Sequence, residues 1–266
     1  MTVRQLPLPD LVRHCRRLGV SGVGLWREPV RKYGTEAAAR LVRDAGLTVT
    51  SLCRGGFFAA SRDPAPVLAD NRAAVDEAAA LGTDTLVLVS GGLPPGSKDL
   101  AAARARISDG LAALVPYAAD RGVRLAVEPL HPMYAADRCA VSTLDQALAL
   151  AAPHPAGRVG VVVDTYHVWW DDRAPAAAVR AAASGRLHAF QLADWTTPLP
   201  AGVLTGRGQL GDGVIDLRGW HTLVDAAGYT GPVEVELFND TLWSRDGADV
   251  LTETVTRYLT HAAPRP

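Results

Sequence analysis

Four short apolar runs of this 266-residue sequence end in side chains that can ligate a metal ion. The runs are LAVE, VVVD, AFQ and VEVE, and their last residues are Glu128, Asp164, Gln191 and Glu236. A carboxylate at the end of so apolar a run needs a partner or a metal, because a bare buried charge is costly. Three carboxylates and an amide oxygen are hard ligands, which favour Mg²⁺ or Mn²⁺ over a metal that prefers thiolates. The set predicts a site for one divalent cation, with Co²⁺ and Zn²⁺ as alternatives to Mn²⁺ and Mg²⁺.

These four residues can meet only if the runs that carry them are strands that share a direction and an edge. Seven runs rich in Val and Leu are predicted to be strands, over residues 21–26, 47–53, 84–90, 123–128, 158–164, 186–194 and 232–238. Ala-rich stretches between them are predicted to be helices, over residues 35–45, 64–81, 98–121, 142–152, 174–184 and 216–227. Such alternation indicates a parallel sheet covered on both faces.

A TIM-type barrel of β/α units is the fold that this alternation favours, in one domain over residues 1–266. A nucleotide-binding sheet is less favoured because neither GxGxxG nor GxxxxGK[ST] occurs. The first clear element is a helix over 8–19 with no strand before it. We therefore expect seven strands, with the first strand of the barrel missing or truncated. Strand alternation would place Ala126, Val162 and Ala189 inward together with the residues that end those strands.

Composition excludes several classes of partner. The net charge is −1, so no basic field is directed at nucleic acid or an anionic membrane. The three cysteines are scattered and odd in number, which is typical of reduced thiols in a cytoplasmic protein. We expect a small-molecule substrate, with no nucleic acid and no membrane. A missing strand would expose a sheet edge, which predicts a homodimer as one way to cover it.

The motifs around the four strand ends resemble those of the sugar phosphate isomerase/epimerase family, within the xylose isomerase-like TIM barrels. The motifs are VEPLHPMYAADR, VVVDTYH, FQLADW and EVELF, together with the loop GRGQLGDG. The resemblance covers residues 8–260, and the relatives include hydroxypyruvate isomerase, ketose 3-epimerases and inosose dehydratase. Members usually begin with a strand, which this chain lacks. Gln191 stands where relatives often have His, as in the hydroxypyruvate isomerase group.

The resemblance implies a metal-dependent isomerase or epimerase that transfers a proton through an enediolate. Glu128 and Glu236 would transfer the proton as well as hold the metal. Arg207, in the loop GRGQLGDG, resembles the substrate-binding arginine of the family. By position, further candidates for contacts to the substrate are His167, one turn after Asp164, His131 and Arg54, just beyond strand ends, and Trp26, as an apolar wall at the end of the first strand.

Other functions and other roles stay open at this point. The same enolate chemistry would serve a dehydratase of a keto-cyclitol, and a barrel without its first strand would also suit a non-catalytic binding or assembly protein. Any one acidic residue at a strand end, Asp164 included, would also serve as a helix cap or a loop ion pair. The parity of their strands predicts a structural ion pair between Arg124 and Glu234.

Overall fold

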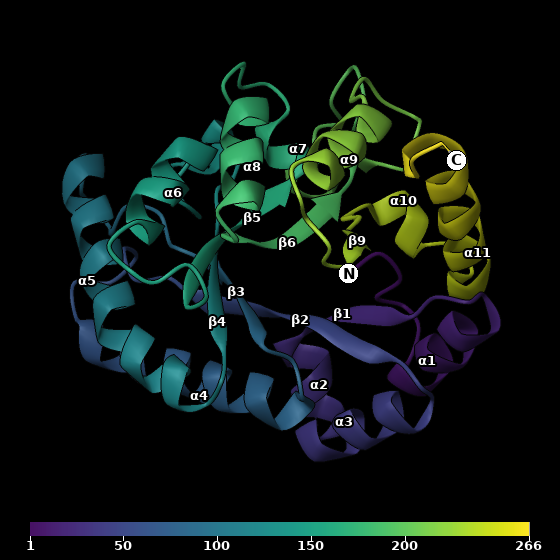
Figure 1. The fold of residues 1–266 in the computed structure, drawn as a ribbon, viewed down its shortest axis with the longest axis horizontal. Helices are drawn as coiled ribbons and strands as arrows, with labels where there is room; N and C mark the ends of the chain where they lie inside the picture. Colours follow the sequence, from purple (N-terminus) through teal and green to yellow (C-terminus); the bar gives the residue numbers. More distant parts are fainter. Residues whose placement is uncertain (266) are drawn as a thin grey trace.

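A computed structural model describes residues 1–265 and shows a parallel sheet of seven strands that is nearly closed into a barrel (Figure 1). Each of the seven predicted strands is present, and no strand precedes the first helix in the part of the chain that is described. The sheet order follows the chain, which is the order of a β/α barrel. The strands are β1 (Gly22–Trp26), β2 (Thr48–Gly56), β3 (Thr85–Val89), β4 (Arg124–Glu128), β5 (Val159–Asp164), β6 (Leu187–Leu192) and β9 (Val233–Val235).

The barrel is open between β1 and β9, which do not pair with each other. The N-terminal residues lie at this opening (Figure 1). The Thr2 hydroxyl donates to the carbonyl of Val235 at 2.7 Å and accepts from the amide of Leu237 at 3.0 Å. The edge of β9 is therefore covered in part within the chain. The homodimer, which was expected because of an exposed edge, stays a prediction.

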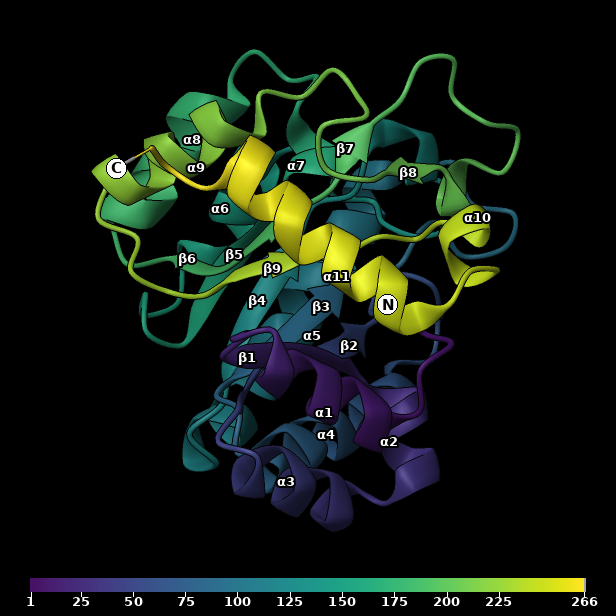
Figure 2. The same ribbon diagram turned by 90° about the vertical axis from the view of Figure 1, so that its right-hand side faces the viewer.

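Helices cover the outside of the sheet (Figure 1). The longer ones are α1 (Leu8–Arg17), α3 (Thr35–Asp44), α4 (Pro64–Leu81), α5 (Leu100–Asp120), α6 (Leu144–Ala151), α8 (Ala174–Ala183), α9 (Leu217–Ala226) and α11 (Gly247–Arg257). The last of these, α11, contacts α1 and lies across the opening between β9 and β1 (Figure 2). Among residues 1–265, none of the helices combines the length and the hydrophobicity that crossing a bilayer requires.

Four helices were not predicted: α11 and the shorter α2 (Arg27–Tyr33), α7 (Thr165–Val168) and α10 (Asp240–Trp243). Helix α2 follows β1 without a loop, and its sequence REPVRKY has no apolar stripe long enough to be recognised. Helix α11 contains GADVLTETVTR, whose β-branched residues have low helix propensity. Its face is nonetheless buried at Val250 and Leu251, so packing stabilises it.

A small apolar cluster fills the barrel below the ends of the strands. It contains Cys53, Val87, Ala126, Val162 and Ala189, with Trp26 packed against it. Three of these lie two residues before Glu128, Asp164 and Gln191. Because side chains alternate along a strand, these three polar side chains share the inward face. The cluster thus forms an apolar floor beneath a polar layer.

Candidate active site

The four predicted ligands are buried at the same end of the barrel, where parallel strands finish. Glu128 ends β4 and Asp164 ends β5, while Gln191 is paired in register with Asp164. Glu236 follows β9, and its amide donates to the carbonyl of Leu192 at 3.1 Å. All four are buried. The sheet therefore brings together groups that lie up to 108 residues apart in the chain, from Glu128 to Glu236.

Asp164 serves two purposes with its two oxygens. Its Oδ1 accepts from the amide of Tyr166 at 2.9 Å and so caps the short helix α7. Its Oδ2 accepts from Nη1 of Arg207 at 2.8 Å. The capping role and the site role are thus compatible, because each uses a different oxygen.

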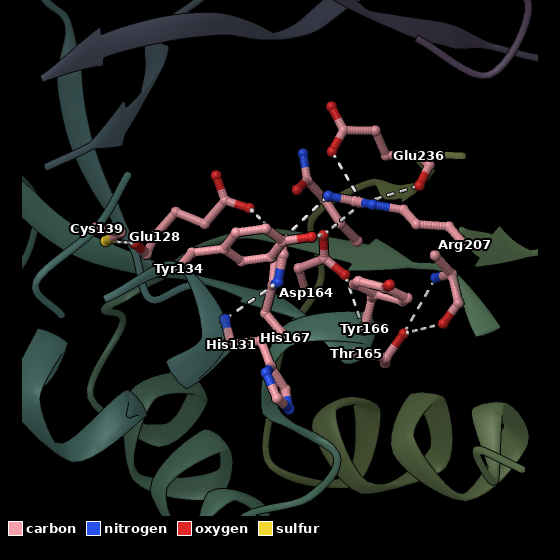
Figure 3. A network of polar contacts seen from close by, with 12 residues as sticks. Glu128, His131, Tyr134, Cys139, Asp164, Thr165, Tyr166, His167, Arg207 and Glu236 are labelled. Atoms are coloured by element: carbon pink, nitrogen blue, oxygen red, sulfur yellow. Dashed lines mark hydrogen bonds and ion pairs between the residues drawn. The ribbon is translucent and has the colours of Figure 1, made fainter. Parts of the chain in front are cut away.

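Arg207 lies at the centre of the cluster and links its members (Figure 3). Besides Asp164, its Nη1 donates to Glu236, at 3.1 Å to Oε2 and at 2.9 Å to the carbonyl. Arg207 belongs to β8 (Arg207–Gly208), which pairs with β7 (Asp194–Trp195). The carboxylate of Asp194 accepts from the amides of Gly211 and Gly213, which fixes the glycine-rich loop that follows Arg207.

The ring of His167 lies beside two hydrogen-bond donors, although only one nitrogen of a neutral imidazole can accept a hydrogen bond. Its Nδ1 accepts from the amide of His131 at 3.2 Å, and its Nε2 lies 3.0 Å from Nη2 of Arg207. Burial, and then the charge of Arg207, lower the pKa of His167 well below its usual range, so the ring is neutral. A neutral imidazole accepts only one hydrogen bond. One of the two contacts is therefore unsatisfied while Arg207 stays beside Nε2.

The cluster holds more negative than positive charge. Glu128, Asp164 and His167 each offer a ligand atom within 4.8 Å of the others, which is close enough to share a metal ion. Burial, followed by repulsion from Glu236 and Asp164, raises the pKa of Glu128 well above its usual range. Burial raises the pKa of Asp164 to about 6, although Arg207 opposes this. A single guanidinium does not compensate three buried carboxylates.

The side-chain amide of Gln191 is a second group whose hydrogen bonds are incomplete among residues 1–265. Its Nε2 donates to Oε2 of Glu234 at 2.8 Å, and its buried Oε1 has no hydrogen-bond partner among residues 1–265. The other oxygen of Glu234 accepts from Ser51 at 2.7 Å and from Thr50. Glu234 thus fixes the amide nitrogen of Gln191 and leaves the amide oxygen free. A buried acceptor without a donor fits a cation.

The predicted ion pair between Arg124 and Glu234 is wrong. Arg124 starts β4 and donates to Asp84, which precedes β3, at 2.9 Å. The neighbouring strand offers this carboxylate directly, since Thr85 and Arg124 are register partners. Glu234 instead meets hydroxyls and an amide from β2 and β6.

A small cavity of about 40 Å³ opens above the cluster. Of the residues predicted to contact substrate, four line this cavity, namely Trp26, Arg54, His167 and Arg207. Trp26 was expected as an apolar wall, but its Nε1 also donates to Oε1 of Glu236 at 3.0 Å. His131 is not part of the lining. Its ring packs against Trp195, with 4.9 Å between the ring centroids.

Seven lining residues were not predicted, namely Cys53, Val89, Leu130, Tyr134, Arg138, Leu204 and Phe238. Leu130, Tyr134 and Arg138 lie in the motif VEPLHPMYAADR, after Glu128. Their position in the loop after a barrel strand was a usable signal, because such loops build the active site. Cys53 and Val89 lie on β2 and β3, and Phe238 ends the motif EVELF, whereas Leu204 comes from a segment without a recognisable pattern.

A model of the xylose isomerase-like TIM barrel family matches residues 12–254. The chain belongs to this family. Among solved structures, SMc04130 from Sinorhizobium meliloti 1021 is 46% identical, with a TM-score of 0.94 over 98% of this chain and 96% of that one. No curated protein sequence matches the chain.

Two more distant solved structures establish the fold alone. The IolI protein with a bound zinc atom is 18% identical, with a TM-score of 0.80 over 94% of this chain and 90% of that one. The 3-keto-D-glucoside 4-epimerase YcjR from E. coli is 20% identical, with a TM-score of 0.76 over 96% and 94%. A zinc-bound protein and a sugar epimerase thus share the fold of this chain.

Proposed function

We propose that this protein is a divalent-metal-dependent isomerase or epimerase of a sugar or sugar phosphate, which acts by proton transfer through an enediolate. One observation carries the proposal: three carboxyl groups, two of them bound to Arg207, are buried beside an amide oxygen that lacks a donor among residues 1–265. Such a cluster is stable only when more positive charge enters it or when protons bind. Family membership and a neighbouring sugar epimerase support the type of substrate.

The residues present fit a hard divalent cation. Glu128, Asp164, Gln191 and Glu236 would supply oxygen ligands, for which Mn²⁺ or Mg²⁺ is the expected partner. When bound, the ion would neutralise the carboxylates and stabilise negative charge on the substrate oxygens. His167 is the alternative ligand, since it lies in the same group as Glu128 and Asp164. The main-chain donor at its Nδ1 favours a proton on Nε2, which suits a contact to a substrate oxygen.

The two glutamates differ in ways that suit a proton shuttle. Glu236 accepts hydrogen bonds from Trp26 and Arg207, which orient its side chain and suit the role of the base. No group among residues 1–265 donates a hydrogen bond to the side chain of Glu128, and its raised pKa suits a group that returns a proton. Return to the same carbon would give epimerisation, and return to the next carbon would give isomerisation.

The first test is the metal content of the purified protein beside two variants. Asp164→Asn keeps the cap of α7 but removes a ligand charge, so we expect about one Mn, Mg, Co or Zn per chain in the wild type and none in the variant. Asp63→Asn is the matched control, because Asp63 caps α4 at an exposed position outside the site. If neither the wild type nor Asp63→Asn holds metal after incubation with Mn²⁺, the proposal is wrong and a non-catalytic barrel is favoured.

The second test is α-proton exchange of keto-sugars in deuterated water, followed by NMR. In the wild type we expect proton exchange without loss of water from the sugar. In Asp164→Asn we expect no proton exchange. Release of water with formation of an unsaturated product would instead identify a dehydratase.

A further inference from the structure

Two arginines that line the cavity have no protein partner. Arg54 and Arg138 make no side-chain hydrogen bond and no ion pair with any residue between 1 and 265, and both are half-buried. The guanidinium carbon of Arg54 lies 4.1 Å from the ring centroid of Phe57. Each guanidinium carries five N–H donors. The wall of the site therefore presents two cations whose hydrogen-bonding capacity is unused.

The main chain holds both arginines in place. The carbonyl of Arg54 accepts from Nη1 of the buried Arg27 at 3.3 Å. The amide of Arg138 donates to the carbonyl of Tyr134 at 3.0 Å, and the next residue, Cys139, is fully buried. These two positions are anchored to the scaffold, unlike arginines on a mobile surface loop.

Arg54 lies near the end of β2 and Arg138 in the loop after β4, and both segments are also tied to the segment after β3. After β2, the amide of Phe57 donates to the carbonyl of Val89 at 2.8 Å. After β4, the amide of Ala140 donates to the carbonyl of Gly91 at 2.9 Å. The segment after β3 thus lies between them and sets their separation. A binding site gains affinity from such pre-organisation.

The charge of the site shows what these arginines are for. With a divalent ion bound, the three carboxylates Glu128, Asp164 and Glu236 are balanced by the ion and by Arg207. A neutral sugar would suit that balanced site. Arg54 and Arg138 then add two positive charges at the wall of the cavity, and neither forms an ion pair with a carboxylate among residues 1–265, which matches an anionic ligand.

We propose that Arg54 and Arg138 bind an anionic group of the substrate at the wall of the cavity, so that the substrate is a ketose bearing a phosphate or a carboxylate. This inference rests on the proposed function and narrows its substrate class. Phosphate and carboxylate share the oxygen acceptors that a guanidinium binds in a bidentate manner.

The test uses three ketoses that differ only at the sixth carbon: D-fructose, D-fructuronate and D-fructose 6-phosphate. Calorimetry on the Mn²⁺-loaded protein would give the three affinities. We expect at least one anionic ketose to bind about tenfold or more tightly than D-fructose, since a charge-assisted hydrogen bond contributes roughly 1.5–3 kcal/mol. The tighter of the two anions identifies carboxylate or phosphate as the recognised group.

Variants assign that preference to the two residues. In the protein with both Arg54→Met and Arg138→Met, we expect the ratio of anionic to neutral affinity to fall to about one. Arg62→Met is the matched control, because Arg62 lies in the loop after β2 but is exposed and does not line the cavity. It should keep the ratio of the wild type. If Arg62→Met lowers the ratio of anionic to neutral affinity as much as the double variant does, the preference comes from the overall positive charge, and the assignment to Arg54 and Arg138 is wrong.

The inference and the proposed function can fail separately. If the wild type holds metal but binds neither anion more tightly than D-fructose, or binds no ketose, this inference is wrong and the metal site stands. The same titrations in the presence of EDTA, which removes metal, test whether the anion preference exists without metal. If no metal is ever bound but the anion preference depends on Arg54 and Arg138, the anion site stands and the proposed catalysis is wrong.

Discussion

Arg27 and Arg207 are both buried and both held by carboxylates, yet their surroundings differ in charge. Arg27, at the start of α2, donates to Glu77 at 2.8 Å and to Asp70 at 2.9 Å. A second arginine, Arg31, pairs with the same two carboxylates. This cluster therefore contains two positive and two negative charges. The hydrogen bond from Arg27 lowers the pKa of Asp70, as expected where the ionised form is stabilised.

Around Arg207 the balance is reversed. Although burial lowers the pKa of Arg207, the charges of Asp164 and Glu236 raise it overall. The carboxyls of Glu128 and Asp164 nonetheless have raised pKa values. The Arg27 cluster is complete within the chain, whereas the Arg207 cluster needs a cation or protons from outside. We regard this difference as the mark that separates a structural ion pair from a functional one.

The largest expected effect concerns the rate of reaction. Glu128→Gln and Glu236→Gln should each lower the rate of α-proton exchange by about 10²–10⁴-fold, because each removes a proton-transfer group. Glu77→Gln, the same change in the Arg27 cluster, should lower stability with a far smaller effect on the rate. Exchange rates measured by NMR check this. A comparable loss of rate in Glu77→Gln would remove the distinction between the two clusters.

Removal of the arginines should separate the clusters by stability. Arg27→Met should cost about 3–5 kcal/mol, the range for breaking a buried ion pair, whether or not metal is present. Arg207→Met should also destabilise the metal-free protein, because it leaves Asp164 without a counter-charge. Mn²⁺ should recover more stability in Arg207→Met than in Arg27→Met, since the ion takes the place of the lost guanidinium charge. Urea unfolding with and without Mn²⁺ measures both.

The clusters should respond to pH in opposite directions. The folded-state pKa of Asp164, about 6, exceeds its ordinary value of 3.8, so the folded protein binds this proton more tightly. The stabilisation is present below about pH 4 and is lost as pH rises through 6. In the metal-free protein, stability relative to Asp164→Asn should fall over this range by on the order of 2–3 kcal/mol.

Asp70 provides the opposite case for the same experiment. Its pKa is lowered in the folded protein, so its stabilisation is present above pH 4 and is lost on acidification below its ordinary value. The stability of the wild type relative to Asp70→Asn should therefore fall with acid. Identical pH trends in both comparisons would contradict the assignment of the two clusters. Taking differences between variants also removes the contribution of the buried histidines.

The smallest expected effect concerns the residue that orients a ligand. Glu234→Gln should weaken Mn²⁺ binding by about tenfold, within the range for residues that hold a metal ligand in place. The reason is that Glu234 fixes the amide nitrogen of Gln191 and so leaves Oε1 free. Glu253→Gln, on α11 among surface arginines, is the control. Calorimetric titration with Mn²⁺ checks the prediction, and an unchanged affinity would exclude Gln191 as a ligand.

The regular part of the fold was predictable because its signals are local. The helix over 64–81 was predicted with its observed bounds, and it ends at Gly82, whose φ of 79° suits a residue without a side chain. The apolar runs predicted all seven strands, although the last is shorter than expected, at Val233–Val235. Helices α2, α7, α10 and α11 were missed because they are short or poor in strong helix formers, and tertiary packing stabilises them.

The sequence by itself determined which residues end the strands and which of them face inward. The period of a strand is two residues, and parallel strands finish at one edge, so Glu128, Asp164 and Gln191 had to share a layer. Only the tertiary structure placed Arg207 between Asp164 and Glu236, and only it showed that Arg54 and Arg138 line one cavity. Arg207 belongs to a two-residue strand and Arg138 to a loop, and Arg54 lies beyond the predicted end of its strand. No periodic pattern fixes the direction of such residues, so their positions depend on contacts between segments far apart in the chain.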